Sequence, residues 1–208
     1  MKRLLTAFAL VLGLSGCATS WVVDSNVQSF SQMTAVPPGA TYRFERLPSQ
    51  QASEAAQQQL EAMAAPALEN VGLRRDDASP RYSAQIGARV TAELSPWADP
   101  WLYGPWGPRY GLGLGLGGGG YGRGWYGGGW YGPVFPQASN PWYAREVSIV
   151  LRELPSNRVV YETRARNDGP YNISEHVLPV MFAAALQGFP NPPAGTRRVD
   201  IEIPTGRK

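Results

Sequence analysis

The single histidine of the chain follows a serine and a glutamate, the residue types of a hydrolytic site. Ser174, Glu175 and His176 could supply a nucleophile, an acid and a base. On a helix, however, Ser174 and His176 point about 200° apart and cannot share a proton. One histidine and one cysteine also exclude a two-histidine metal site and a multi-cysteine zinc site. We therefore expect no enzyme, no metal and no cofactor, and we expect His176 to be a surface or helix-cap residue.

A glycine-rich and aromatic segment, residues 95–141, is the second candidate for chemistry. It contains 15 of the 24 glycines and five of the seven tryptophans. Trp125, Tyr126, Trp130 and Tyr131 form two near-repeats, and such rings could stack on a sugar, on peptidoglycan or on a partner protein, or enter lipid headgroups. The alternative is a low-complexity spacer that binds nothing specific. Because so much glycine makes ordering costly in backbone entropy, we expect a flexible, disordered insert.

The first seventeen residues have the pattern of an export signal. Two basic residues precede an apolar run over residues 4–12, which is shorter than the about 20 residues that span a bilayer and fits a secretory signal of roughly 7–15. The sequence Leu-Ser-Gly-Cys at residues 14–17 resembles the bacterial lipobox. The resemblance implies that residues 1–16 are removed and that Cys17 becomes the lipidated N-terminus. Two or more acyl chains on one residue give stable membrane anchoring.

The processed chain would be close to neutral. Loss of Lys2 and Arg3 reduces the 19 basic residues to 17 against 16 acidic ones, a formal net charge of +1. An exported chain with so little charge offers no attractive field for nucleic acid, which we do not expect as a partner. The expected partners are the membrane, through the lipid, and an envelope protein or a glycan. By the same resemblance, Ala18 after the cysteine implies a location at the outer membrane, facing the periplasm.

Hydrophobic periodicity predicts a single α+β domain in two parts, residues 17–94 and 142–208, on either side of the insert. Alternation of apolar and polar residues predicts six strands. They are expected near residues 22–27, 42–44, 82–94, 147–151, 159–165 and 199–203. The fourth and fifth strands are expected to form a hairpin. Together with two helices, this order favours a mainly antiparallel sheet with both helices packed on one face.

The two helices carry recognisable signals of their own. Apolar residues at spacings of three and four predict a helix over residues 51–72 that stops at Gly72. Pro66 lies inside this segment and predicts a kink or a break. Asn172 and Glu175 have the spacing of a capping box and predict the start of the second helix.

These features together resemble a family of bacterial lipoproteins known only as domain-of-unknown-function family 4136. The likeness rests on the lipobox, on the strand order around the first helix and on a closing helix that ends Leu-Gln-Gly-Phe-Pro. It covers residues 20–95 and 143–203, and it brings no catalytic residues. We expect a lipid-anchored cell-envelope protein of non-enzymatic, structural or interaction type. The alternative is a lipoprotein that binds glycan or peptidoglycan through the aromatic residues of the insert.

Overall fold

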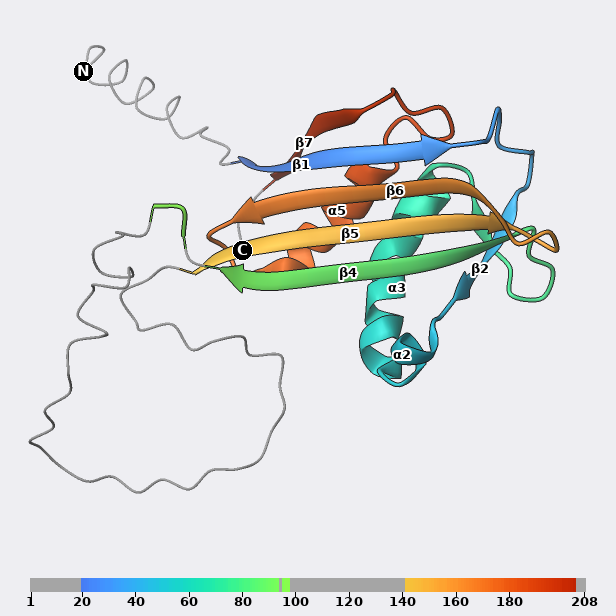
Figure 1. Ribbon diagram of the computed structural model, residues 1–208, viewed down its shortest axis with the longest axis horizontal. Coiled ribbons are helices and arrows are strands. Elements are labelled where there is room, and N and C mark those ends of the chain that lie inside the picture. Colours follow the sequence, from blue (N-terminus) through green and yellow to red (C-terminus); the bar gives the residue numbers. More distant parts are fainter. Residues whose placement is uncertain (1–19, 94, 98–140, 205–208) are drawn as a thin grey trace, which may run out of the picture.

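A computed structural model describes residues 20–93, 95–97 and 141–204 (Figure 1). These residues form one sheet of seven strands together with three helices. The strands are β1 (Ser20–Ser31), β2 (Thr41–Glu45), β3 (Arg74–Arg75), β4 (Tyr82–Glu93), β5 (Trp142–Glu153), β6 (Arg158–Gly169) and β7 (Thr196–Pro204). The helices are α2 (Pro48–Gln51), α3 (Glu54–Asn70) and α5 (Ser174–Ala185).

The sheet is mixed, with the strand order β3-β2-β4-β5-β6-β1-β7. Pairing is antiparallel from β4 through β5, β6 and β1 to β7, whereas β2 is parallel to both β3 and β4. The α+β class agrees with expectation, but the prediction of a mainly antiparallel sheet with two helices is wrong for the described part of the chain. Apolar alternation determines which face a side chain takes and says nothing of the direction of the neighbouring strand. The extra elements, α2 and β3, are too short to show a period.

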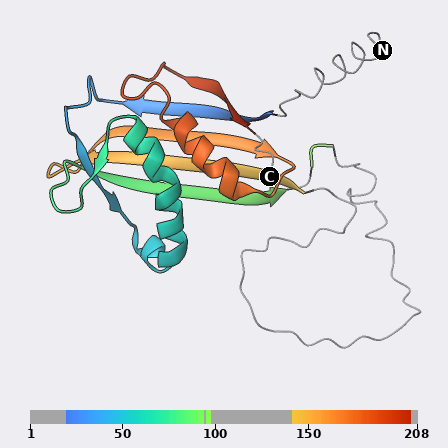
Figure 2. The same ribbon diagram turned by 180° about the vertical axis from the view of Figure 1, so that it is seen from behind.

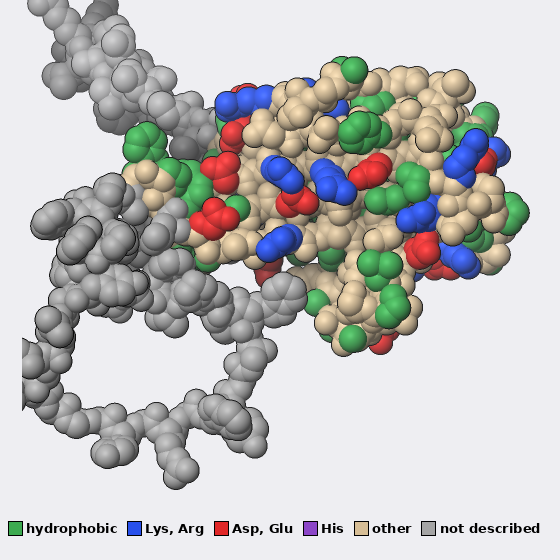
Figure 3. Space-filling model, in the orientation of Figure 1, with side chains coloured by type: hydrophobic (Ala, Val, Ile, Leu, Met, Phe, Trp, Pro, Cys, Tyr) green, Lys and Arg blue, Asp and Glu red, His purple; other side chains and the backbone are tan. Residues whose placement is uncertain are grey.

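The two long helices, α3 and α5, cover one face of the sheet (Figure 2). In the described part of the chain, the other face carries no helix, and Figure 3 shows arginine and acidic side chains spread over it. The sequence accounts for this difference. In β5, Val147, Ile149 and Leu151 are buried under the helices, while the residues between them point to the open face.

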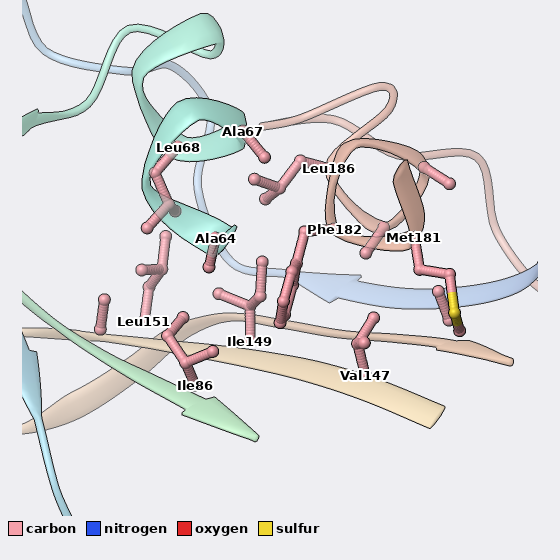
Figure 4. Packing of buried hydrophobic residues seen from close by; sticks show 14 of the residues in the cluster. Ala64, Ala67, Leu68, Ile86, Val147, Ile149, Leu151, Met181, Phe182 and Leu186 are labelled. Atoms are coloured by element: carbon pink, nitrogen blue, oxygen red, sulfur yellow. The ribbon is translucent and has the colours of Figure 1, made fainter. Parts of the chain in front are cut away.

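The hydrophobic core lies between the helix layer and the sheet (Figure 4). Ile86 and Ile149 project from the sheet toward Phe182 of α5, and Leu151 projects toward Leu68 of α3. All five of these side chains are fully buried. Burial of each contributes about 1.5–3 kcal/mol relative to an exposed side chain, so this layer fixes the helices on the sheet.

Helix α3 is continuous through Pro66, so of the kink or break predicted there, the break is wrong. A proline inside a helix costs about 3 kcal/mol, because it removes a backbone donor and crowds the preceding turn. Pro66 itself is exposed, while Ala64, Ala67 and Leu68 around it are buried in the core. Their burial offsets the cost of the proline and keeps the segment helical.

The predicted stop of this helix at Gly72 is confirmed. Gly72 has a φ of +89°, a conformation that favours glycine. Its N–H donates to the carbonyl of Glu69 at 2.9 Å, and the N–H of Leu73 donates to the carbonyl of Leu68 at 3.1 Å. This pair of bonds is a Schellman closure, which satisfies the last carbonyls of the helix.

The sheet has two ends of different character. At one end, on the left of Figure 1, β1 and β5 begin and β4, β6 and β7 end. We call it the tryptophan end, because Trp21, Trp97 and Trp142 belong to it. At the opposite end, the hairpin end, β5 turns into β6 through residues 154–157, which confirms the predicted hairpin. The chain leaves β4 and enters β5 at the tryptophan end, where Glu93 and Trp142 are register partners.

Candidate functional site

The three tryptophans in the described part of the chain all lie at the tryptophan end. Trp21 is the second residue of β1, Trp142 is the first of β5, and Trp97 follows shortly after β4. Trp97 is 86% exposed, and Tyr171, just before α5, is 54% exposed. Large exposed apolar side chains that cluster at one place mark a surface for interaction rather than for solvation.

Packing and hydrogen bonds hold several of these rings in place. The rings of Trp21 and Tyr171 meet edge to face, with centroids 5.3 Å apart and planes at 72°. The indole N–H of Trp142 donates to Oδ2 of Asp168 on the neighbouring strand, β6, at 2.7 Å. Ile173, two residues after Tyr171 in the sequence, is 44% exposed. The end therefore presents an aromatic surface that is built by β1, β5 and the segment before α5.

A buried arginine positions the start of α5 at this end. Arg145 is 3% exposed and lies on the helix-covered face of β5. Its Nε donates to Ser174 Oγ at 3.3 Å, and Nη1 donates to Asn167 Oδ1 at 3.3 Å. Nη2 donates to the carbonyl oxygen of Tyr171, and the guanidinium lies 5.5 Å from the ring centroid of Tyr143. Burial lowers the pKa of Arg145 from its usual value, because a charged group is costly to remove from water.

This network replaces the predicted capping box, which is wrong. The N-cap of α5 is Ile173, and no side chain caps the helix there. The backbone N–H of Ser174 donates to the carbonyl of Asn172 at 2.9 Å. The first turn is thus fixed to the sheet through Arg145, and its placement comes from tertiary contacts rather than from a local motif.

A groove of about 550 Å³ opens beside Trp142 and includes residues of the uncovered face of the sheet. Arg89, Glu146 and Arg166 are register neighbours on β4, β5 and β6 and lie in its lining. Arg166 Nε lies 2.6 Å from Glu146 Oε2. A tryptophan next to paired polar side chains could bind a sugar, with the ring stacking and the charged groups accepting or donating hydrogen bonds.

A larger hollow, about 750 Å³, lies toward the other end of β1. Phe30, Val160 and Pro192 supply apolar surface there, and Ser29 and Ser31 supply hydroxyls. Ser29 Oγ is already bonded to Thr163 Oγ1 at 2.8 Å. The described lining presents no cluster of titratable side chains, so this hollow points to no particular chemistry.

The structure separates the three residues that could form a hydrolytic site. Ser174 Oγ accepts the hydrogen bond from Arg145, whereas His176 is exposed on the helix surface, as expected. In residues 20–93, 95–97 and 141–204, no group of three or more His, Cys, Asp or Glu residues could hold a metal ion. No helix in the described segments has the length and apolar character needed to cross a membrane.

The other predicted site residues lie outside the described residues. These are the lipidation residue Cys17 and the insert residues Trp125, Tyr126, Trp130 and Tyr131. What the sequence reasoning missed is the aromatic surface at the tryptophan end. Trp21 lies four residues after Cys17, and Trp97 and Trp142 flank the segment 98–140, so their positions were a usable signal. Arg145 stands two residues before Val147 in β5, so its side chain points to the same face as the apolar residues of this strand. This spacing would have predicted its burial.

The class defined by these features is an α+β domain with a mixed seven-stranded sheet and an aromatic surface at one end. The chain belongs to the family described as Domain of unknown function (DUF4136), which matches residues 25–191. The family resemblance seen in the sequence is thereby confirmed. A comparison with curated proteins finds no match.

A comparison with solved structures gives matches of low sequence identity. A PDZ domain protein from Parabacteroides distasonis ATCC 8503 matches 95% of this chain at 14% identity and a TM-score of 0.49, and the match covers 42% of that protein. Two structures of a PelC dodecamer from Paraburkholderia phytofirmans match with a TM-score of 0.42 each. They are 14% and 10% identical, over 78% and 81% of this chain and 94% and 99% of theirs.

Proposed function

We propose that this chain is a lipid-anchored cell-envelope protein whose domain has a structural or interaction role and no enzymatic one. The observation that carries the proposal is the N-terminal sequence, in which a short apolar run ends in Leu-Ser-Gly-Cys at Cys17. The first described strand begins three residues later, at Ser20. An anchor at Cys17 would therefore attach directly to a folded domain, with almost no linker.

The site geometry is consistent with an interaction role. The hydroxyl of Ser174 is engaged by Arg145 rather than poised as a nucleophile, and His176 faces solvent. The exposed rings of Trp97 and Tyr171 offer contact area instead. Tryptophan and tyrosine are well suited to contacts in which one part of the ring is apolar and the other is wet. An outer-membrane location, as Ala18 implies, is part of the proposal.

The anchor is tested on the full chain expressed in a bacterium. The wild type should incorporate labelled fatty acid, and mass spectrometry should find the acylated N-terminus at Cys17. Cys17→Ala should abolish both, and the unprocessed precursor should accumulate. Thr19→Ala, two residues away, is the matched control and should be processed like the wild type. A mature wild-type N-terminus without acyl groups would refute the proposal.

Glycan or peptidoglycan binding is a second candidate, supported by the groove beside Trp142. Its lining offers Arg89, Glu146 and Arg166 as hydrogen-bonding groups next to an indole ring. Retention on a peptidoglycan pull-down should then fall for Arg166→Met. It should also fall when Trp125 and Trp130 are both replaced by alanine. Unchanged retention for both variants would remove this candidate.

A further inference from the structure

We propose that the tryptophan end of the sheet lies in the headgroup region of a lipid bilayer. The docking surface consists of Trp21, Trp97, Tyr171 and Ile173. The inference rests on the lipid anchoring proposed above and goes beyond it. An anchor alone leaves the orientation of the domain open, whereas this surface specifies which part of the domain touches the membrane.

The length of the tether is the first argument. Ser20 is three residues after Cys17 in the sequence, and an extended chain spans at most about 3.6 Å per residue. The start of β1 is thus held within about 11 Å of the acylated residue, whatever conformation residues 17–19 adopt. Ser20 belongs to the tryptophan end, so this end must stay at the membrane surface when Cys17 is anchored.

The chemistry of the surface is the second argument. Trp and Tyr are enriched where a protein crosses the membrane–water interface, because their rings are apolar and their N–H or O–H groups remain hydrated. Seven large hydrophobic side chains are exposed in the described part of the chain. Four of them are at this end, Val22, Trp97, Tyr171 and Ile173, and they are brought there by β1, by the end of β4 and by the segment before α5.

The charges around the surface indicate what kind of membrane it fits. Three acidic residues are exposed at this end: Glu93 is the last residue of β4, Asp168 is the second-to-last of β6, and Glu175 lies in the first turn of α5. Arg89 and Arg166, which line the groove beside Trp142, are exposed here too, but Arg166 is paired with Glu146, and Arg145 is buried, so acidic side chains outnumber the exposed basic ones. Acidic side chains do not attract anionic lipids. The aromatic rings therefore supply the affinity, and zwitterionic headgroups are the expected occupant.

The experiment uses the lipidated full chain in vesicles of phosphatidylcholine and phosphatidylethanolamine, with lipids brominated near the head of the acyl chains as quenchers. To remove background emission, four tryptophans are changed to phenylalanine, Trp101, Trp106, Trp125 and Trp130. The fluorescence of Trp97 is then obtained as the difference in emission between this protein and the same protein with the additional change Trp97→Phe. We expect this signal to be quenched by the shallow bromines and not by bromines at the chain ends, because interfacial groups lie roughly 5–10 Å deep.

The matched control places a tryptophan at an exposed aromatic position toward the other end of β1. Phe30 is 60% exposed at the second-to-last residue of β1. The emission that Phe30→Trp adds should be unaffected by either brominated lipid. The same quenching of Trp97 is expected in vesicles that contain phosphatidylglycerol, since the proposed contact is aromatic rather than electrostatic.

The outcomes separate this inference from the proposed function. If the protein does not float with the vesicles, the lipid anchor fails, and the docking surface fails with it. If it floats but Trp97 is not quenched, or Phe30→Trp is quenched equally, the anchor stands and the docking surface is refuted. Quenching only in phosphatidylglycerol vesicles would also overturn it. A spectral change of Trp97 with peptidoglycan fragments but not with brominated lipid would assign the surface to a glycan.

Discussion

The two ends of the sheet are made by the same strands but expose different side chains. The hairpin end carries ion pairs, with Glu153 3.2 Å from Arg158 and 3.8 Å from Arg81, and with Arg75 3.0 Å from Asp77. At the tryptophan end the pair of Arg166 with Glu146 is accompanied by the exposed rings of Trp97 and Tyr171, whereas Phe30 is the exposed ring toward the hairpin end. Core packing dictates neither set, because both lie at the rim of the sheet. The difference between the ends therefore indicates which end binds other molecules, and it does not follow from the requirements of folding.

The largest change in stability is expected when the buried arginine of the tryptophan end, Arg145, is replaced. Arg145→Met keeps the aliphatic stem but removes the donors to Asn167, Tyr171 and Ser174. A fully buried acceptor left without a partner costs about 1–3 kcal/mol, and these acceptors are partly buried, so we expect a loss of about 2 kcal/mol in total in the free energy of unfolding, after the gain from no longer burying the charge. Urea denaturation followed by circular dichroism measures it.

Arg158→Met at the hairpin end is the matched control. Arg158 is exposed and its pair with Glu153 is solvated, so its loss should change the free energy of unfolding by about 0.5 kcal/mol or less. Equal losses for the two variants would contradict the argument that Arg145 fixes the tryptophan end from within.

Which of these features the sequence reveals depends on how local their cause is. The strand at residues 82–93 and the closure at Gly72 follow from alternation and from one glycine. The parallel pairing of β2 does not, since it depends on the path of the chain across α3. Helix α3 continues through Pro66 because of tertiary burial, which a local rule cannot weigh.

The candidate site is harder to predict for the same reason. Trp21, Trp97 and Trp142 are far apart in the sequence, and only the pairing of the strands brings them to the same end of the sheet, as where Glu93 pairs with Trp142. Cys17 could be proposed from sequence because the lipobox is contiguous. The positions of Trp97 and Trp142 on either side of residues 98–140 hint at the aromatic surface, but which residues it joins depends on which strand ends coincide.

The next prediction tests whether the tryptophan end folds without the segment between its strands. Since Glu93 and Trp142 are paired, replacing residues 98–140 with Asn-Gly leaves a short loop that can still close. Shortening the connection several-fold should stabilise the domain by about 1.5 kcal/mol, because a shorter loop loses less entropy on closure. Thermal unfolding should show a transition midpoint higher by about 3–6 °C. A collapse of the transition would mean that the segment contributes to the fold.

The smallest effect is expected from Tyr42 in β2, whose register partner Tyr82 begins β4 at the hairpin end. Its hydroxyl is buried without a hydrogen-bond partner among the described residues, and burial raises its pKa from 10.0 to about 12. Tyr42→Phe removes that polar group and should stabilise the domain by about 1 kcal/mol at neutral pH. The native state holds the phenol proton more tightly than the unfolded chain, so the wild type loses stability as the pH rises from about 10 to 12. The variant should lose less over that range in urea titrations, and identical pH profiles would show that Tyr42 is solvated in the native state.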